Sequence, residues 1–132
     1  MIAVDTNVVV RLLTEDDKQQ TEVAKSLFAS GPIWISKTVL LESGWVLKFD
    51  YGFTEAAIRE ALTELLGLRH VFTEDKPGMV AALSMTARGV GFADAMHLSS
   101  APAGVTFVSF DRTFIRRAKR AGALVEFAEQ AV

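Results

Sequence analysis

The chain has 132 residues, half of them hydrophobic, and carries 14 Lys and Arg against 16 Asp and Glu. This length allows one domain with a substantial core, and no apolar run approaches the ~20 residues of a membrane span. The net charge of −2 argues against a protein that holds nucleic acid by overall positive charge, and the absence of cysteine excludes disulfides and thiolate metal sites. We therefore expect a single domain, residues 1–132, in a reducing cytoplasm.

Short apolar runs alternate with helical patterns along the whole chain. The runs predict strands at 2–4, 33–35, 70–72, 106–110 and 124–126. The first run has no polar side, so we expect it to be buried on both faces as a central strand. Helices are predicted at 8–13, 15–29, 37–49, 54–66, 77–88, 92–100 and 112–121. Strands separated by helices predict an α/β fold, with a mostly parallel central sheet of about five short strands and helices on both faces.

Three aspartates occupy positions where a ligand site is common in such folds. Asp5 and Asp111 each directly follow an apolar strand, and Asp94 lies in the first turn of a predicted helix. The crevice beyond the carboxyl ends of parallel strands is where α/β proteins bind ligands. Each aspartate also has a simpler interpretation as a helix cap or first-turn acid, and three such acids would require no metal.

Glu42 does not fit the capping interpretation. Its predicted helix, 37–49, is apolar on nearly every face, so we expect the helix to be buried almost all round. A buried carboxylate is retained when it is paired, protonated or bound to a cation. A salt bridge to a Lys or Arg and a functional role both account for Glu42.

Taken together, these acids favour a metal site. Carboxylates that converge on one crevice repel each other unless a cation is present. Oxygen ligands without cysteine or a pair of histidines select Mg²⁺ or Mn²⁺ over Zn²⁺. Hydrolysis of a phosphodiester is the reaction that most naturally uses such a site.

Four sequence blocks resemble those of PIN-domain ribonucleases, and most closely the VapC-type toxins of bacterial toxin–antitoxin pairs. The blocks are Val-Asp-Thr-Asn-Val at 4–8, Leu-Glu-Ser at 41–43, Phe-Ala-Asp-Ala-Met-His at 92–97 and Val-Ser-Phe-Asp-Arg-Thr-Phe at 108–114. The likeness covers essentially the whole chain and implies the PIN-like three-layer fold. Each block alone is a weak signal, whereas four in order with suitable spacing are a strong one.

The resemblance implies an acidic quartet of Asp5, Glu42, Asp94 and Asp111. The three aspartates would be metal ligands, and Glu42 would bind the metal directly or through another ligand. Two polar residues would support the site: Asn7 by positioning the first acid, and Ser109 by contacting substrate or by a hydrogen bond within the sheet. Thr6 is interpreted as a local cap, and His97, one helical turn after Asp94, as a structural histidine.

The family mechanism, as the resemblance implies it, is hydrolysis of RNA by water activated on one or two Mg²⁺ or Mn²⁺ ions, which leaves a 5′-phosphate and a 3′-hydroxyl. The implied partners are an RNA substrate, a cognate VapB-type antitoxin and a second copy in a homodimer, with no membrane. Arg112 and Arg116, on the basic helix 112–120, are candidates for contact with RNA phosphates. The alternative is a solvated helix face paired with nearby acids.

Other function classes fit less well. A phosphatase of the haloacid-dehalogenase type needs a second Asp two residues after the first, and that position is Asn7. A phosphoacceptor receiver domain needs a Lys at the end of a late strand, and none follows 106–110. The remaining rival is a catalytically silent PIN-like module that binds RNA or protein without cutting.

Overall fold

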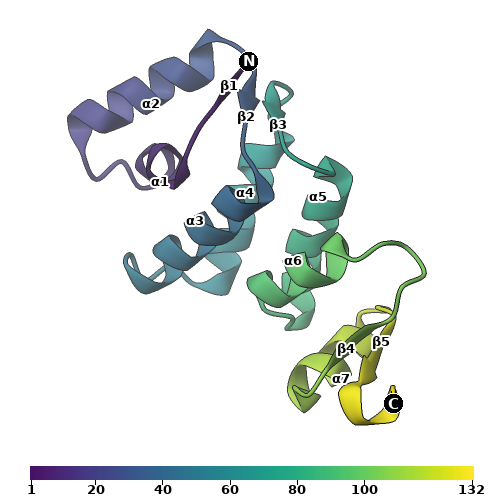
Figure 1. The fold of residues 1–132 in the computed structure, drawn as a ribbon. Helices are drawn as coiled ribbons and strands as arrows, with labels where there is room; N and C mark the ends of the chain where they lie inside the picture. The colour runs from purple at the N-terminus through teal and green to yellow at the C-terminus, as the bar shows by residue number, and fades with distance from the viewer. The chain divides into compact units, whose positions relative to one another are not determined.

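The computed structural model describes all of residues 1–132, and the chain divides into two compact units, Met1–Lys76 and Pro77–Val132. Five strands, all paired in parallel, are interspersed with seven α-helices (Figure 1). The predicted α/β class with parallel strands is therefore confirmed. The strands form two sheets, one in each unit. None of the helices has the length and apolar content that a membrane span requires.

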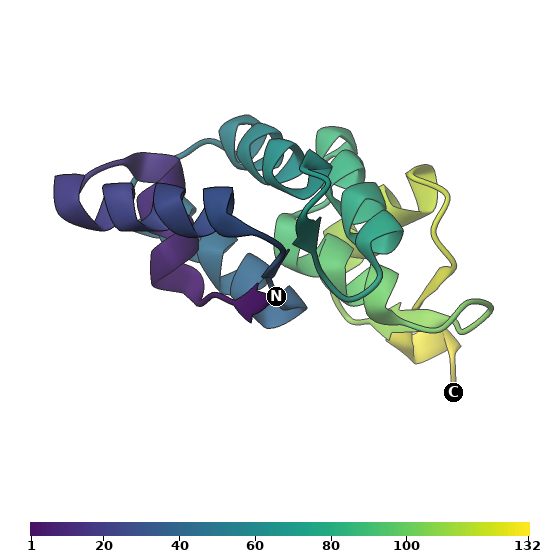
Figure 2. The ribbon, with the colours of Figure 1, turned by 90° about the horizontal axis from the view of Figure 1, so that it is seen from above.

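The first unit contains a three-stranded sheet and four helices. Its strands are β1 (Ile2–Ala3), β2 (Ile33–Trp34) and β3 (Val71–Phe72), and its helices are α1 (Thr6–Thr14), α2 (Lys18–Ser30), α3 (Lys37–Phe49) and α4 (Glu55–Gly67). The strand order is β1-β2-β3. Figures 1 and 2 show α1 and α2 packed side by side, and α1 also contacts α3.

The second unit contains a two-stranded sheet and three helices. Its strands are β4 (Phe107–Ser109) and β5 (Val125–Phe127), and its helices are α5 (Lys76–Met85), α6 (Phe92–Ser100) and α7 (Arg112–Arg120), with 3₁₀ turns at Thr86–Arg88 and Ala128–Gln130. Helix α7 packs on both strands. Each unit has its own fully buried side chains, such as Ile33 and Leu62 in the first and Met79 and Ile115 in the second.

Two local predictions are corrected. Strand β1 is an edge strand of its sheet and Ile2 is 42% exposed, so the expectation of a central strand buried on both faces is wrong. The acids at 15–17 do not together begin a helix. Glu15 ends α1 in the left-handed conformation (φ 55°), and Asp17 caps α2 by accepting the Gln20 N–H at 2.9 Å.

A polar network fixes α1 within the first unit. Arg11 donates from Nη1 to the Tyr51 hydroxyl at 2.9 Å and from Nε to Gln20 Oε1 at 2.7 Å. The Tyr51 hydroxyl donates to Asp16 Oδ2 at 2.5 Å, and Arg11 also pairs with Asp16 at 3.2 Å. The network joins α1 to α2 and to the loop that follows α3, where Tyr51 lies 40 residues from Arg11 in sequence.

Removing the Tyr51 hydroxyl should weaken this network. The hydrogen bond from Tyr51 is the main reason that the pKa of Asp16 lies below its ordinary value. A lowered carboxyl pKa contributes stability above the unfolded-state pKa, and this stability is lost as pH falls through the folded-state pKa. Tyr51→Phe should therefore lower Tm by on the order of a few degrees at neutral pH, and the difference from the parent should shrink in acid.

Thermal unfolding followed by circular dichroism across pH tests this prediction. Lys25→Gln is the matched control, because it breaks only the exposed pair between Lys25 and Glu15 and should change Tm little. An unchanged Tm for Tyr51→Phe at neutral pH would show that the network does not stabilise the unit.

Candidate functional site

Asp5 lies at the turn from β1 into α1 and caps the helix. Its Oδ1 accepts the N–H of Val8 at 3.2 Å. The capping interpretation of Asp5 is thus correct. The residue is exposed, and its second carboxylate oxygen accepts no hydrogen bond. One carboxylate oxygen of Asp5 therefore caps α1, and the other accepts no hydrogen bond.

Glu42 lies next to this turn and has a different environment from the one predicted. It is exposed on α3, and its Oε1 accepts a hydrogen bond from the hydroxyl of buried Thr6. The expectation that Glu42 is buried without a local partner is wrong, and so is the assignment of Thr6 as a cap. Because Asp5 already caps α1, the Thr6 hydroxyl is available for a partner distant in sequence.

The expectation that α3 is buried almost all round is also wrong. Leu40, Ser43, Gly44 and Leu47 form its buried side, whereas Trp45 and Phe49 are 58% and 71% exposed. The two exposed rings contact each other edge-on, with centroids 6.3 Å apart. The predicted limits of the helix are confirmed, and Ser36 caps it, since Ser36 Oγ accepts the Val39 N–H at 3.2 Å.

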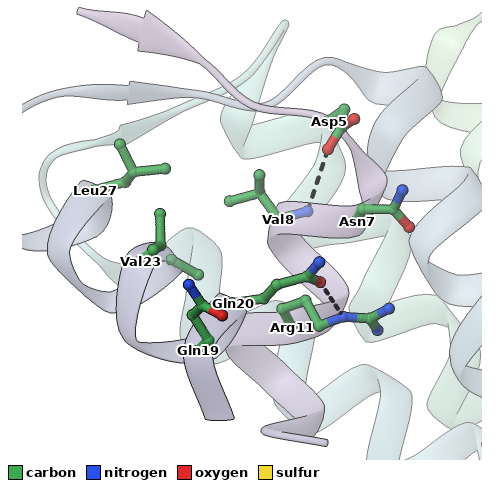
Figure 3. Close-up of a pocket in the computed structure, with 9 residues that line it drawn as sticks. Asp5, Asn7, Val8, Arg11, Gln19, Gln20, Val23 and Leu27 are labelled. Atoms are coloured by element: carbon green, nitrogen blue, oxygen red, sulfur yellow. Dashed lines mark hydrogen bonds between the residues drawn. The ribbon is translucent and has the colours of Figure 1, made fainter. Parts of the chain in front are cut away.

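A hollow of about 570 Å³ lies between α1 and α2, with Asp5 and Asn7 among its lining residues (Figure 3). The other lining side chains include apolar Val8, Val23 and Leu27. Asn7 is exposed and makes no hydrogen bond to Asp5. The predicted positioning role of Asn7 stays a prediction.

Asp94, in the second unit, is the one candidate aspartate that does not cap a helix. It lies in the first turn of α6, but the N-cap of that helix is Gly91, and the Asp94 carboxylate accepts no hydrogen bond. Partial burial, reinforced by the negative charge of Asp111, raises the pKa of Asp94 above its ordinary value, and His97 opposes this shift. Asp94 is therefore not a cap, but it is a first-turn acid of α6, as the simpler interpretation predicted. His97 is exposed, so it is not a core residue.

Asp111 lies at the turn from β4 into α7 and repeats the arrangement of Asp5. Its Oδ1 accepts the N–H of Phe114 at 3.0 Å, which caps α7. Ser109 Oγ accepts the N–H of Asp111 at 3.0 Å. Ser109 thus makes a local bond that fixes the backbone of the acid, and a contact between Ser109 and substrate stays a prediction.

The cations of α7 are exposed and are not paired with acids. The predicted alternative is thus right that this helix face is solvated and wrong that acids pair with it. Arg112 and Lys119 lie over the Phe127 ring, 4.9 and 5.5 Å from its centroid. Arg117 donates to the Gly89 carbonyl at 3.1 Å. Arg116 is exposed and has no partner.

The candidate acids thus fall two in each unit. In the first unit, Asp5 is adjacent in sequence to Thr6, which holds Glu42. In the second unit, Asp94 and Asp111 are close enough for one charge to shift the pKa of the other. Neither unit by itself gathers three or more acidic or histidine side chains into a metal-binding group. The quartet as a single site stays a prediction.

Sequence reasoning missed Thr6 as the residue that holds Glu42. The available signal was its position directly after Asp5, because two successive polar side chains cannot both cap the same helix N-terminus in the same way. The hydroxyl of Thr6 had to bond elsewhere, since it is buried and cannot reach water freely.

The chain is similar to known proteins over most of its length. The PIN domain family matches residues 2–120. Among solved structures, the crystal structure of VapC20 from Mycobacterium tuberculosis, described as a toxin that cleaves the sarcin–ricin loop, is similar. The two are 23% identical, the alignment covers 93% of this chain and 96% of that one, and the TM-score is 0.45. No functionally curated protein matches the sequence at a significant level. Because the family match spans nearly the whole chain, from strand β1 through helix α7, this protein belongs to the PIN domain family.

Proposed function

We propose that this protein is a metal-dependent endoribonuclease, the toxin of a bacterial toxin–antitoxin pair. In this proposal the chain acts as one domain, residues 1–132, and Asp5, Glu42, Asp94 and Asp111 hold a divalent cation, Mg²⁺ or Mn²⁺. Membership of the PIN domain family supports it, together with the four acidic blocks in order along the chain.

The observation that carries the proposal is the state of Asp94. A partly buried carboxylate that accepts no hydrogen bond and lies near a second carboxylate destabilises the empty protein. A cation removes this cost, because it attracts both charges and replaces the missing hydrogen bonds. A carboxyl group whose pKa is raised by burial and by a neighbouring charge is a candidate for a functional site.

The donor set fits a hard cation, because every candidate ligand is a carboxylate oxygen. Asp5 and Asp111 can each offer the oxygen that does not cap a helix, and Asp94 can offer both of its oxygens. The Thr6 hydroxyl holds Glu42 by one oxygen and leaves the other available. When bound, the cation lowers the pKa of water and stabilises charge on a phosphoryl oxygen.

The partners follow from the proposed toxin role. An RNA is the substrate, a VapB-type antitoxin is the inhibitor, and the protein acts in the cytoplasm. The exposed aromatic side of α3, with Trp45 and Phe49, offers apolar surface that a homodimer would cover.

A catalytically silent PIN-like module is the second candidate. It would keep the fold and bind RNA or protein without cleavage. The exposed cations on α7 suit such a module equally well, so cleavage with and without Mg²⁺ or Mn²⁺ separates the two functions.

Asp5→Asn and Asp94→Asn should each abolish RNA cleavage, by at least about 100-fold, because an amide is a poor ligand for a hard cation. Asn also caps helices well, so Asp5→Asn should still fold. Cleavage of a labelled RNA by purified protein, and growth arrest in a host without the antitoxin, are the measurements.

Asp17→Asn is the matched control for this experiment. Asp17 caps α2 as Asp5 caps α1, but it belongs to none of the four blocks. This variant should cut RNA at the parent rate. Full activity of Asp5→Asn or Asp94→Asn would contradict the assignment, as would loss of activity in Asp17→Asn with the fold intact.

Asp94→Asn should also melt at or above the temperature of the metal-free parent at neutral pH. A raised carboxyl pKa means that ionised Asp94 costs stability, and the cost appears as pH rises through the folded-state pKa. The gap in Tm should therefore close as pH falls. Mg²⁺ or Mn²⁺ should raise the Tm of the parent and not that of the variant.

Calorimetry with and without the cation across pH tests this account. A clear loss of Tm in metal-free Asp94→Asn would show that the carboxylate stabilises the fold and would favour a structural role.

A further inference from the structure

Phe110 is an exposed aromatic residue with no partner beside a candidate catalytic acid. It follows β4, directly precedes Asp111 and is 77% exposed. Its aromatic neighbours are engaged: Phe107 and Phe114 contact edge-on with centroids 5.8 Å apart, and Phe114 is buried. The fold of the second unit therefore does not account for the ring of Phe110.

Two basic side chains on α7 likewise have no partner within the chain. Arg116 and Arg120 are exposed and make no ion pair, hydrogen bond or ring contact within the chain. They are four residues apart, so they share one face of the helix with a rise of about 6 Å between them. Arg112 and Lys119 differ, since both lie over the Phe127 ring.

These features occupy one short stretch of the second unit. From the Asp111 cap to Arg120 the helix rises about 13 Å, and Phe110 directly precedes the cap. The charge of Asp111 is the only negative charge in this stretch, and no acid forms an ion pair with the arginines. Exposed cations and an exposed aromatic ring are the elements with which proteins bind single-stranded nucleic acid.

We propose that Phe110, Arg116 and Arg120 form a binding track for unpaired RNA, in which the Phe110 ring stacks on a base next to Asp111 and the two arginines hold phosphates. The proposal rests on the proposed ribonuclease function and deepens it, because it names the side chains that hold the RNA strand beside Asp111. A base within a duplex has both faces covered, whereas an unpaired base can stack on a side chain.

The test for Phe110 uses the Asp94→Asn protein, so that RNA stays intact, and fluorescence anisotropy with a labelled short polyuridine. Phe110→Ala should weaken binding about ten-fold or more, since stacking on an aromatic side chain contributes strongly to single-strand affinity. Phe110→Trp should restore binding, and Phe110→Leu, which keeps apolar bulk without an aromatic face, should not. A self-complementary duplex should bind equally to all of these variants.

The test for the arginines is the salt dependence of the same binding. Arg116→Gln and Arg120→Gln should each reduce the slope of log affinity against log salt by about 0.7, as loss of one phosphate contact does on a single strand. The matched control is Arg69→Gln, because Arg69 is also exposed and unpaired but lies in the first unit. The control should leave the slope unchanged.

The outcomes separate this inference from the proposed function. In one outcome, the parent fails to cleave RNA while Phe110→Ala loses binding and Phe110→Trp restores it. This result would contradict the ribonuclease function and support the binding track. Normal cleavage by the parent, with equal binding by Phe110→Ala and Phe110→Leu and unchanged slopes for the arginine variants, would overturn the track alone. Absence of measurable polyuridine binding by the Asp94→Asn protein would also overturn it.

Discussion

A carboxylate has two oxygens, and a helix cap uses only one of them. Both turns from a strand into a helix that carry a candidate acid follow this rule. Asp5 caps α1 and Asp111 caps α7, each through Oδ1. The cap fixes the carboxylate at the carboxyl end of a parallel strand, where ligands bind in α/β folds. Capping and metal binding are therefore compatible roles of one side chain, although the sequence presents them as alternatives.

The other two acids, Glu42 and Asp94, do not cap a helix. Glu42 is held by the Thr6 hydroxyl, which ties α3 to the first turn of α1. The carboxylate of Asp94 accepts no hydrogen bond, and burial together with the charge of Asp111 raises its pKa. A cation bound by this carboxylate would offset the loss of stability, because it attracts the negative charge.

Local signals predicted much of the fold because they act within a few residues. The limits of α3 and α6 agree with prediction, since the signals that begin and end a helix lie within a few residues of its ends. The burial of Glu42 was predicted wrongly because periodicity shows which faces of a helix are apolar, not which of them the chain covers. Trp45 and Phe49 are apolar and exposed.

Contacts between residues far apart in the chain could not be predicted from the sequence. Arg11 and Tyr51 meet 40 residues apart, and no pattern of spacing links them. The hydrogen bond from Thr6 to Glu42 spans 36 residues for the same reason. The family resemblance implied roles for the four acids, which stay predictions. The structure shows which of these acids caps a helix and which accepts no hydrogen bond.

The most direct test of the account is whether the four acids bind one cation. Mn²⁺ is paramagnetic, so amide signals near a bound ion broaden in nuclear magnetic resonance spectra of the labelled protein. We predict that signals near Asp5, Glu42, Asp94 and Asp111 broaden together, at the same Mn²⁺ concentration, and recover when excess Mg²⁺ is added. Broadening confined to fewer than all four acids, or spread evenly over surface carboxylates such as Glu55 and Glu64, would contradict the proposed site.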